Sequence, residues 1–113
     1  LNLQVAVSYG GRAEIADAAM RYAQDVLDGK VDASTAPSDE TFRRYLYAPD
    51  VPDPDLIIRT SGEFRLSNFL LWESAYSEFW KTDTLWPDFG KDEFEAALES
   101  FSGRERRMGG RLK

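Results

Sequence analysis

Two short apolar runs, separated by a segment long enough for a helix, constrain the fold of this 113-residue chain more than any other feature. The runs cover residues 3–9 and 56–58, and both are too short to be helices, which indicates buried strands. A strand, a helical crossover and a second strand predict a parallel pair with a right-handed connection. We therefore predict an α/β fold, a parallel sheet flanked by helices, with Arg12 and Arg59 at the same edge of the sheet.

The apolar periodicity predicts helices over residues 12–27, 67–79 and 92–107, with a short helix after Ser38. Ser38 and Ser67 are the residue type that commonly caps a helix N-terminus. The residues expected to face inward on the first and last of these helices are Ile15, Ala19, Tyr22, Val26, Phe94, Leu98 and Phe101. Trp86-Pro87-Asp88-Phe89 reads as an aromatic turn.

Composition excludes several classes of function. The chain has no Cys and no His, so disulfides, thiol chemistry and the commonest metal ligand are absent, and any metal would be a hard, oxygen-bound cation such as Mg²⁺. The net charge of −6 argues against general nucleic-acid binding. Residues 103–113 carry +4, so the remainder carries −10. This basic tail is either a solvated helix end or a segment that reaches a phosphate.

Polar residues gather where the second apolar run ends. Arg59 follows the run, and Glu63, Arg65 and Ser67 come within the next eight residues. Ligand sites in α/β sheets usually lie at the carboxyl ends of the strands, and guanidinium groups and a helix N-terminus both suit a phosphate. The pattern indicates a phosphate or diphosphate site. The alternative is an ion pair at the rim of the sheet, between Arg59 and either Glu63 or Asp55.

The turn Gly10-Gly11 ends the first apolar run and precedes Arg12. Two glycines there indicate a tight strand-to-helix turn, where the backbone can approach another group closely. Arg12 is then either a member of an ion pair at the end of the sheet or a ligand-binding residue.

At this point the sequence resembles a known family. RTSGEFRLSNFLLWESAYSE, followed by WPDF, resembles the signature of the cis-prenyltransferases, the undecaprenyl diphosphate synthase family. YGGRAEI near the start and RERRMGG near the end resemble two further motifs of that family. The resemblance covers essentially the whole chain, residues 1–113, and the second half of a typical member. The first residue is Leu1, within an apparent strand, and we expect the chain to be the C-terminal part of a single cis-prenyltransferase domain.

The resemblance implies an enzyme that condenses isopentenyl diphosphate with an allylic diphosphate such as farnesyl diphosphate. It implies a Mg²⁺ requirement and a homodimer. The residues that match positions holding isopentenyl diphosphate are Arg59, Arg65 and Ser67, and Arg12 and Glu63 are expected to line the site. Glu78 matches an acid associated with Mg²⁺. Arg107 and Gly109 match a tail that completes a partner's site.

Two departures from the family pattern stand out. Ser8 occupies a position where many members have Asn. The Asp-Gly-Asn-x-Arg-Trp element, which carries the expected catalytic aspartate, is absent, so we expect this piece alone to be inactive. Two alternatives remain, a non-catalytic partner subunit and a phosphate-ligand binding module. Undecaprenyl diphosphate or a similar product, and a cytoplasmic location near a membrane surface, are the expectations for the complete protein.

Overall fold

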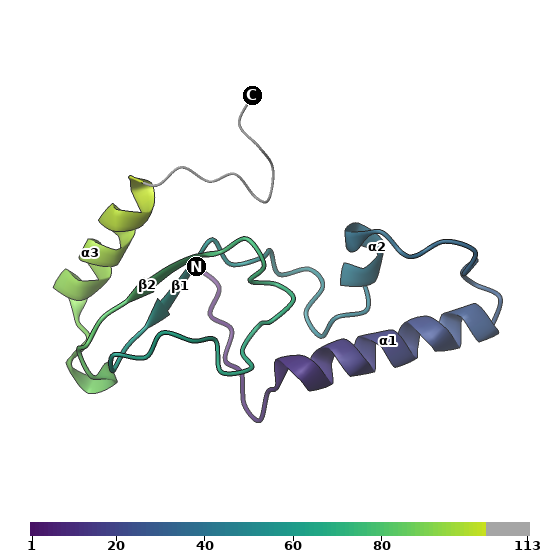
Figure 1. Cartoon of the computed structure of the whole chain (residues 1–113), viewed down its shortest axis with the longest axis horizontal. Coiled ribbons are helices and arrows are strands. Elements are labelled where there is room, and N and C mark those ends of the chain that lie inside the picture. The colour runs from purple at the N-terminus through teal and green to yellow at the C-terminus, as the bar shows by residue number, and fades with distance from the viewer. Residues whose placement is uncertain (104–113) are drawn as a thin grey trace. The chain divides into compact units, whose positions relative to one another are not determined.

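The computed structural model describes residues 1–103, which form two compact units (Figure 1). The first unit contains Leu1–Pro52 and Asn68–Trp72. The second contains Asp53–Ser67 and the described residues from Glu73 onward.

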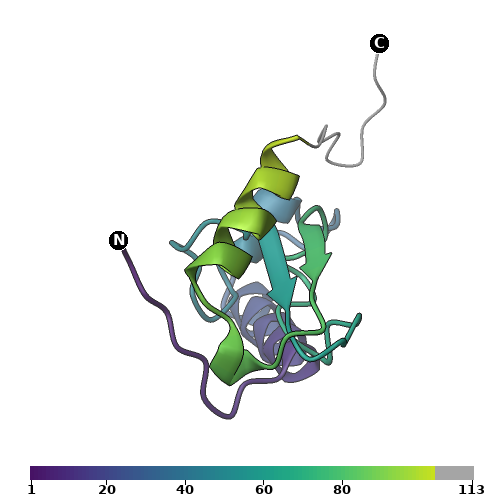
Figure 2. The same cartoon turned by 90° about the vertical axis from the view of Figure 1, so that its left-hand side faces the viewer.

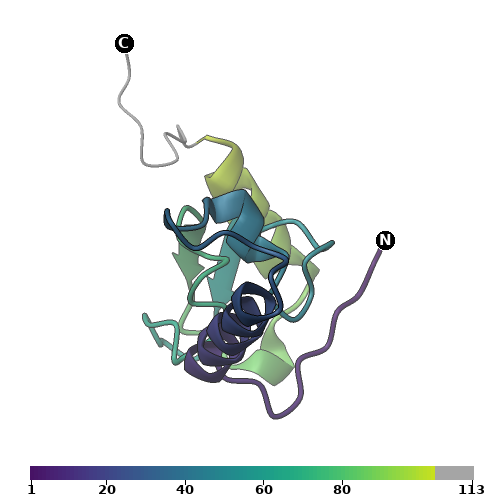
Figure 3. The ribbon, with the colours of Figure 1, turned by 90° about the vertical axis from the view of Figure 1, so that its right-hand side faces the viewer.

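The first unit is built from α1 (Gly11–Leu27) and α2 (Asp39–Arg43). Ser38 caps α2 as predicted, since its hydroxyl accepts a hydrogen bond from the Thr41 N–H at 3.1 Å. α2 and the turn after it lie along α1 (Figures 1 and 3). There the rings of Tyr45 and Tyr22 pack edge to face with their centres 5.5 Å apart, and Leu46 is buried.

The face of α1 that packs inward agrees with the prediction in part, since three of the four residues predicted to face inward are half-buried. Gly11, Glu14 and Ala18 are buried at a spacing of three and four residues, whereas Ala19 is exposed. Apolar periodicity missed Glu14 because it is a carboxylate, which hydrogen bonds rather than hydrophobicity hold in the interior.

The second unit contains β1 (Leu56–Arg59), β2 (Glu78–Lys81), the 3₁₀ turn η1 (Trp86–Asp88) and α3 (Lys91–Ser102). The two strands are parallel, with Leu56 opposite Glu78 and Arg59 opposite Lys81. α3 packs against β2 (Figure 2). The expected aromatic turn is present, and in it the rings of Trp86 and Phe89 are stacked with their centres 5.8 Å apart. The predicted α/β class with parallel strands and helices is confirmed.

A carboxylate also sets the inward face of α3. The hydroxyls of Thr82 and Thr84 donate to the Glu93 carboxylate at 3.2 and 2.8 Å. Ala97, one turn along on the same face, is fully buried. This orientation leaves Phe94 and Leu98 exposed by 45% and 44%, so their predicted inward positions are wrong.

Residues 1–9 contain no strand, so the prediction for 3–9 is wrong. Leu1, Leu3, Val5 and Val7 are exposed. A strand needs a hydrogen-bonded neighbour, and in the described part of the chain nothing pairs with this segment.

The helix predicted over 67–79 is also absent. Ser67, Asn68 and Leu70 have φ angles of 52°, 65° and 48°, a left-handed conformation that ends a right-handed helix. Ser67 is therefore no helix cap, and Glu78 opens β2 instead of closing a helix. Pairing of Phe79 and Trp80 with β1 outweighed the helical spacing of the aromatic residues.

Candidate functional site

The loop after β1 is held in place by the segment that follows β2. The N–H of Ser61 donates to the Thr84 carbonyl, and that of Gly62 to the Thr82 carbonyl, both at 2.9 Å. The Thr82 N–H in turn donates to the Arg59 carbonyl at 2.9 Å. Gly62 has a φ of 70°, a conformation that suits glycine. Backbone hydrogen bonds thus fix the loop that carries the predicted binding residues.

Within this loop the structure brings Arg59 and Arg65 together. The Nη1 of Arg59 donates to the Arg65 carbonyl at 2.7 Å, and the Arg65 guanidinium forms an ion pair with Glu63. Glu63 therefore pairs with Arg65 and not with Arg59, which was one of the two partners considered for Arg59. A guanidinium has five N–H donors, so a single bond to a carbonyl does not exhaust it. The loop thus places a half-buried Arg59 at the carboxyl end of a parallel strand and an Arg65 whose charge is paired with Glu63, and the guanidinium donors of such a loop suit an anionic ligand.

Ser67 closes the loop and is exposed. Its φ of 52° continues into a left-handed Asn68. The predicted role of Ser67 at a helix N-terminus is wrong, since no helix begins there. Its hydroxyl, two residues after Arg65 in the sequence, remains a hydrogen-bond donor and acceptor.

The first unit holds Arg12 in the first turn of α1. The N–H of Gly11 donates to the Asn68 carbonyl at 2.7 Å, and the N–H of Arg12 donates to Asn68 Oδ1 at 2.9 Å. Arg12, Asn68 and Leu71 line a pocket of about 250 Å³. Asn68 therefore provides the cap that Gly10, with no side chain, cannot supply.

The glycines of the predicted turn are required by this close approach. A Cβ on Gly11 would lie 2.7 Å from Leu71 Cγ and 3.0 Å from the Asn68 carbonyl oxygen. A Cβ on Gly10 would lie 3.0 Å from Asn68 Nδ2. The close approach expected at Gly10-Gly11 is present, and the segment Asn68–Leu71 makes it.

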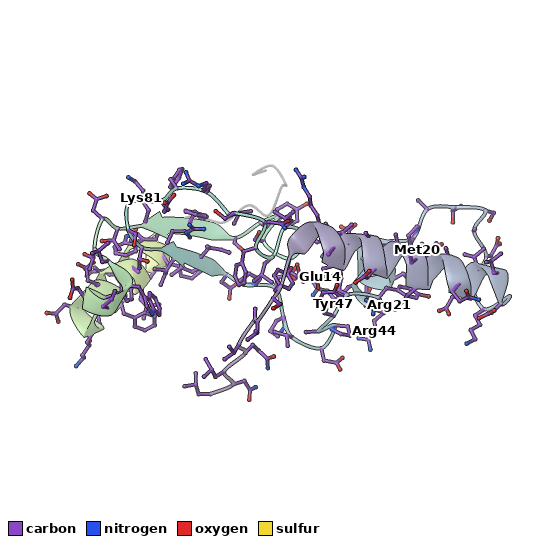
Figure 4. The ribbon with its side chains drawn as sticks, turned by 90° about the horizontal axis from the view of Figure 1, so that it is seen from below. Glu14, Met20, Arg21, Arg44, Tyr47 and Lys81 are labelled. Atoms are coloured by element: carbon purple, nitrogen blue, oxygen red, sulfur yellow. The ribbon has the colours of Figure 1, made fainter. Side chains whose placement is uncertain are left out.

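Glu14 is the charged residue that sequence reasoning missed. It is 2% exposed, and its carboxylate accepts hydrogen bonds from the Tyr9 hydroxyl and, at 3.1 Å, from the Tyr47 N–H. Figure 4 shows Glu14, Tyr47 and Arg21 on one side of α1. The Arg21 guanidinium lies 5.5 Å from the centre of the Tyr47 ring. Glu14 thus ties both the turn before α1 and the turn after α2 to the helix that carries Arg12.

Two tyrosines that follow α2 donate hydrogen bonds to carboxylates on α1. The hydroxyl of Tyr47 donates to Asp17, and that of Tyr45 donates to Asp25 at 2.6 Å. Each hydrogen bond favours the neutral phenol and raises the pKa of its tyrosine above the usual 10.0.

Glu78, the predicted Mg²⁺ residue, is half-buried at the start of β2, and its N–H donates to the Asp55 carbonyl at 2.9 Å. Within residues 1–103 no three acidic side chains gather in a metal-binding cluster. Mg²⁺ in phosphate-transfer sites is commonly held by one or two carboxylates and by the phosphates themselves. Glu78 fits a Mg²⁺ that arrives with a diphosphate, and the described residues do not fit a cage made of protein ligands alone.

Arg107 and Gly109 lie outside the described residues. Among the helices of the described chain, none combines the length and apolar character needed to cross a membrane.

Taken together, the parallel strands, the arginine loop at a strand end and the capped helix carrying Arg12 define an α/β protein with candidate anion-binding residues. A family model described as "Putative undecaprenyl diphosphate synthase" matches residues 1–109. The chain belongs to this family, the cis-prenyltransferases.

Individual relatives agree with this assignment. An isoprenyl transferase of Thermotoga maritima is 61% identical over 97% of this chain and 46% of its own length. A trans,polycis-polyprenyl diphosphate synthase ((2Z,6E)-farnesyl diphosphate specific) of Thermobifida fusca is 56% identical over 97% of this chain and 39% of its own length. The crystal structure of lavandulyl diphosphate synthase from Lavandula x intermedia in complex with dimethylallyl diphosphate has a TM-score of 0.84 and 40% identity, covering 91% of this chain and 44% of that one. The chain thus spans less than half the length of these relatives.

Proposed function

We propose that this chain is the C-terminal part of a cis-prenyltransferase that condenses isopentenyl diphosphate with an allylic diphosphate such as farnesyl diphosphate. The product is a Z-polyprenyl diphosphate, undecaprenyl diphosphate or a similar chain. Family membership supports this proposal, and so does the relative in Thermobifida fusca, whose name specifies a farnesyl diphosphate. The observation that carries it is the loop after β1, in which Arg59 and Arg65 are held together at a strand end.

The reaction joins two carbon centres while a diphosphate departs. The double bond of isopentenyl diphosphate attacks the allylic carbon, the bond from that carbon to its diphosphate oxygen breaks with the electron pair going to the diphosphate, and a proton is lost from the new chain. No group in this chain needs to become covalently attached. The task of its residues is to hold the donor diphosphate so that the double bond faces the allylic carbon, and such positioning supplies a large part of the rate.

In this proposal Arg59, Arg65 and Ser67 bind the diphosphate of isopentenyl diphosphate. Glu63 orients Arg65 through their ion pair. Arg12 is proposed as a substrate-binding residue on the family resemblance alone. Guanidinium groups suit this role because their planar donors match phosphate oxygens.

Glu78 would help to hold Mg²⁺, which neutralises charge on the diphosphate when it is bound. Arg107 and Gly109 are proposed to complete the site of a second subunit in a homodimer. The catalytic aspartate expected for the family is proposed to lie in the part of the protein that precedes these motifs.

The experiment that tests this function uses the full-length protein. It is incubated with isopentenyl diphosphate, farnesyl diphosphate and Mg²⁺, and the products are read by mass spectrometry. A ladder of masses rising by one isoprene unit at each step is expected, and its longest member gives the product length. Binding of isopentenyl diphosphate without any product would overturn the enzyme proposal and favour a partner subunit or a binding module.

A further inference from the structure

Asn68 has no role in the substrate contacts proposed above, yet it makes two hydrogen bonds to the backbone at the start of α1. Its carbonyl accepts from the Gly11 N–H at 2.7 Å, and its Oδ1 accepts from the Arg12 N–H at 2.9 Å. These donors belong to the first turn of a helix, where N–H groups have no partner within the helix itself. A residue 56 positions away in the chain therefore caps α1.

The backbone conformation of Asn68 allows it to cap α1. Its φ of 65° is left-handed, which asparagine tolerates better than most residues. This backbone directs both the carbonyl and the side chain of Asn68 toward α1. Leu71, from the same short segment, sits against the bare Cα of Gly11. The segment is thus locked to the helix by two hydrogen bonds and by a contact that excludes a Cβ.

The residue whose backbone Asn68 holds is Arg12, and both residues line the same pocket of about 250 Å³. An arginine has a long and flexible side chain, so the place its guanidinium can reach depends on where its backbone is fixed. Losing the cap would loosen the first turn of α1 and widen the range of positions open to that guanidinium.

We propose that Asn68 is a positioning residue, which acts on substrate through Arg12 by capping the helix that carries it. This inference rests on the proposed function, since it assigns Arg12 to a diphosphate. The capping bond sets the Arg12 backbone, and the guanidinium binds the ligand. Asn68 itself does not need to touch the substrate.

The test compares Arg12→Ala, Asn68→Gly and the double variant in the full-length enzyme. Glycine keeps the left-handed backbone and the carbonyl of residue 68, so this substitution removes only the side chain. Arg12→Ala first identifies the diphosphate substrate whose KM depends on Arg12. Asn68→Gly should raise the KM for that same substrate several-fold, because the loosened first turn lets the Arg12 guanidinium take positions away from the ligand, with kcat changed much less.

The double variant separates a positioning role from a direct one. If Asn68 acts through Arg12, adding Asn68→Gly to Arg12→Ala should produce no further rise in KM, because the two residues form one interacting unit. A full additional rise in the double variant, or an effect of Asn68→Gly on the other substrate only, would overturn the inference.

Leu46→Ala is the matched control for loss of stability, because Leu46 is buried in the same unit and is not among the residues that line the pocket. It should lower the melting temperature without raising the KM. An equal rise in KM for Leu46→Ala would assign the Asn68→Gly effect to general destabilisation and overturn the proposal.

Failure of the proposed function would be recognised separately, as a full-length protein that makes no product. The same variants would then be compared by their Kd for inorganic diphosphate. Asn68→Gly should weaken that binding in the wild-type background and leave it unchanged in the Arg12→Ala background. Unweakened binding in the wild-type background would refute the positioning role by itself.

Discussion

Replacing Gly11 with alanine tests the packing that joins the first turn of α1 to the segment Asn68–Leu71. The new Cβ would lie 2.7 Å from Leu71 Cγ and 3.0 Å from the Asn68 carbonyl oxygen, whereas carbon atoms in contact are normally about 3.5–4.0 Å apart. Overpacking of this kind typically costs about 1–3 kcal/mol. Alanine recovers about 0.5–1 kcal/mol through its better helix propensity. At the midpoints of these two ranges, the expected net loss in the free energy of unfolding is about 1–1.5 kcal/mol.

The assay is thermal unfolding of the full-length protein followed by circular dichroism. A loss of that size corresponds to a fall in Tm of about 2–6 °C for a protein of 150–250 residues. The matched control is Gly103→Ala, because a Cβ on Gly103 meets no atom of residues 1–103 nearer than 3.8 Å and its φ of −83° suits alanine. That control should leave the Tm unchanged or slightly raised. Equal Tm values for Gly11→Ala and the wild type would refute the close approach on which the capping of α1 depends.

Three further outcomes are expected of the full-length enzyme. Arg59→Ala and Arg65→Ala should each raise the KM for isopentenyl diphosphate by about ten-fold or more, as expected for a lost charge-assisted hydrogen bond. If kcat and KM are unchanged in both variants, neither arginine binds this substrate. Glu78→Gln should raise the Mg²⁺ concentration needed for half-maximal activity several-fold, and a normal Mg²⁺ titration would contradict its role. The bond to Asp17 raises the pKa of Tyr47 above 10.0, so the stability it contributes is present below pH 10 and is lost as the pH rises through the folded-state pKa. The measurement is the tyrosinate absorbance of the wild type and of Tyr47→Phe as a function of pH. The difference between the two titration curves reports Tyr47, and its midpoint should lie above pH 10. A midpoint at or below pH 10 would be inconsistent with the bond.

Much of the local structure followed from the sequence because local rules decided it. The helix after Gly10, the Ser38 cap, the strand ending at Arg59 and the aromatic turn at Trp86 all appear where they were predicted. Each depends on propensities and capping chemistry within a few residues. The family motifs were likewise recognisable from the sequence, since they are runs of consecutive residues.

The errors fall where distant residues set the outcome. The helix predicted after Ser67 is replaced by left-handed turns, because Asn68 bonds to the start of α1 and Phe79 pairs with β1. The strand predicted over 3–9 lacks a neighbour in the described part of the chain. Its predicted pairing with β1, which would have placed Arg12 and Arg59 at one sheet edge, is therefore not formed there.

The same distinction between local and distant determinants applies to the candidate site. Consecutive motif residues identified Arg59, Glu63, Arg65 and Ser67, together with Arg12 and Glu78, from the sequence alone. The roles of Glu14 and Asn68 could not be read from the sequence. A buried glutamate looks like any helical surface acid, and an asparagine after a serine looks like an ordinary turn residue.

The sequence by itself therefore determined the family and the fold class, and it supplied the cationic candidates for a diphosphate site, since these depend on residue type and local order. Only the tertiary structure decided which partner each polar group takes. It assigned Glu63 to Arg65, buried Glu14 between two turns, and placed Asn68 over the first turn of α1. The physical reason is that a buried polar group must find a hydrogen-bond partner wherever the chain brings one close, and sequence separation does not limit that choice.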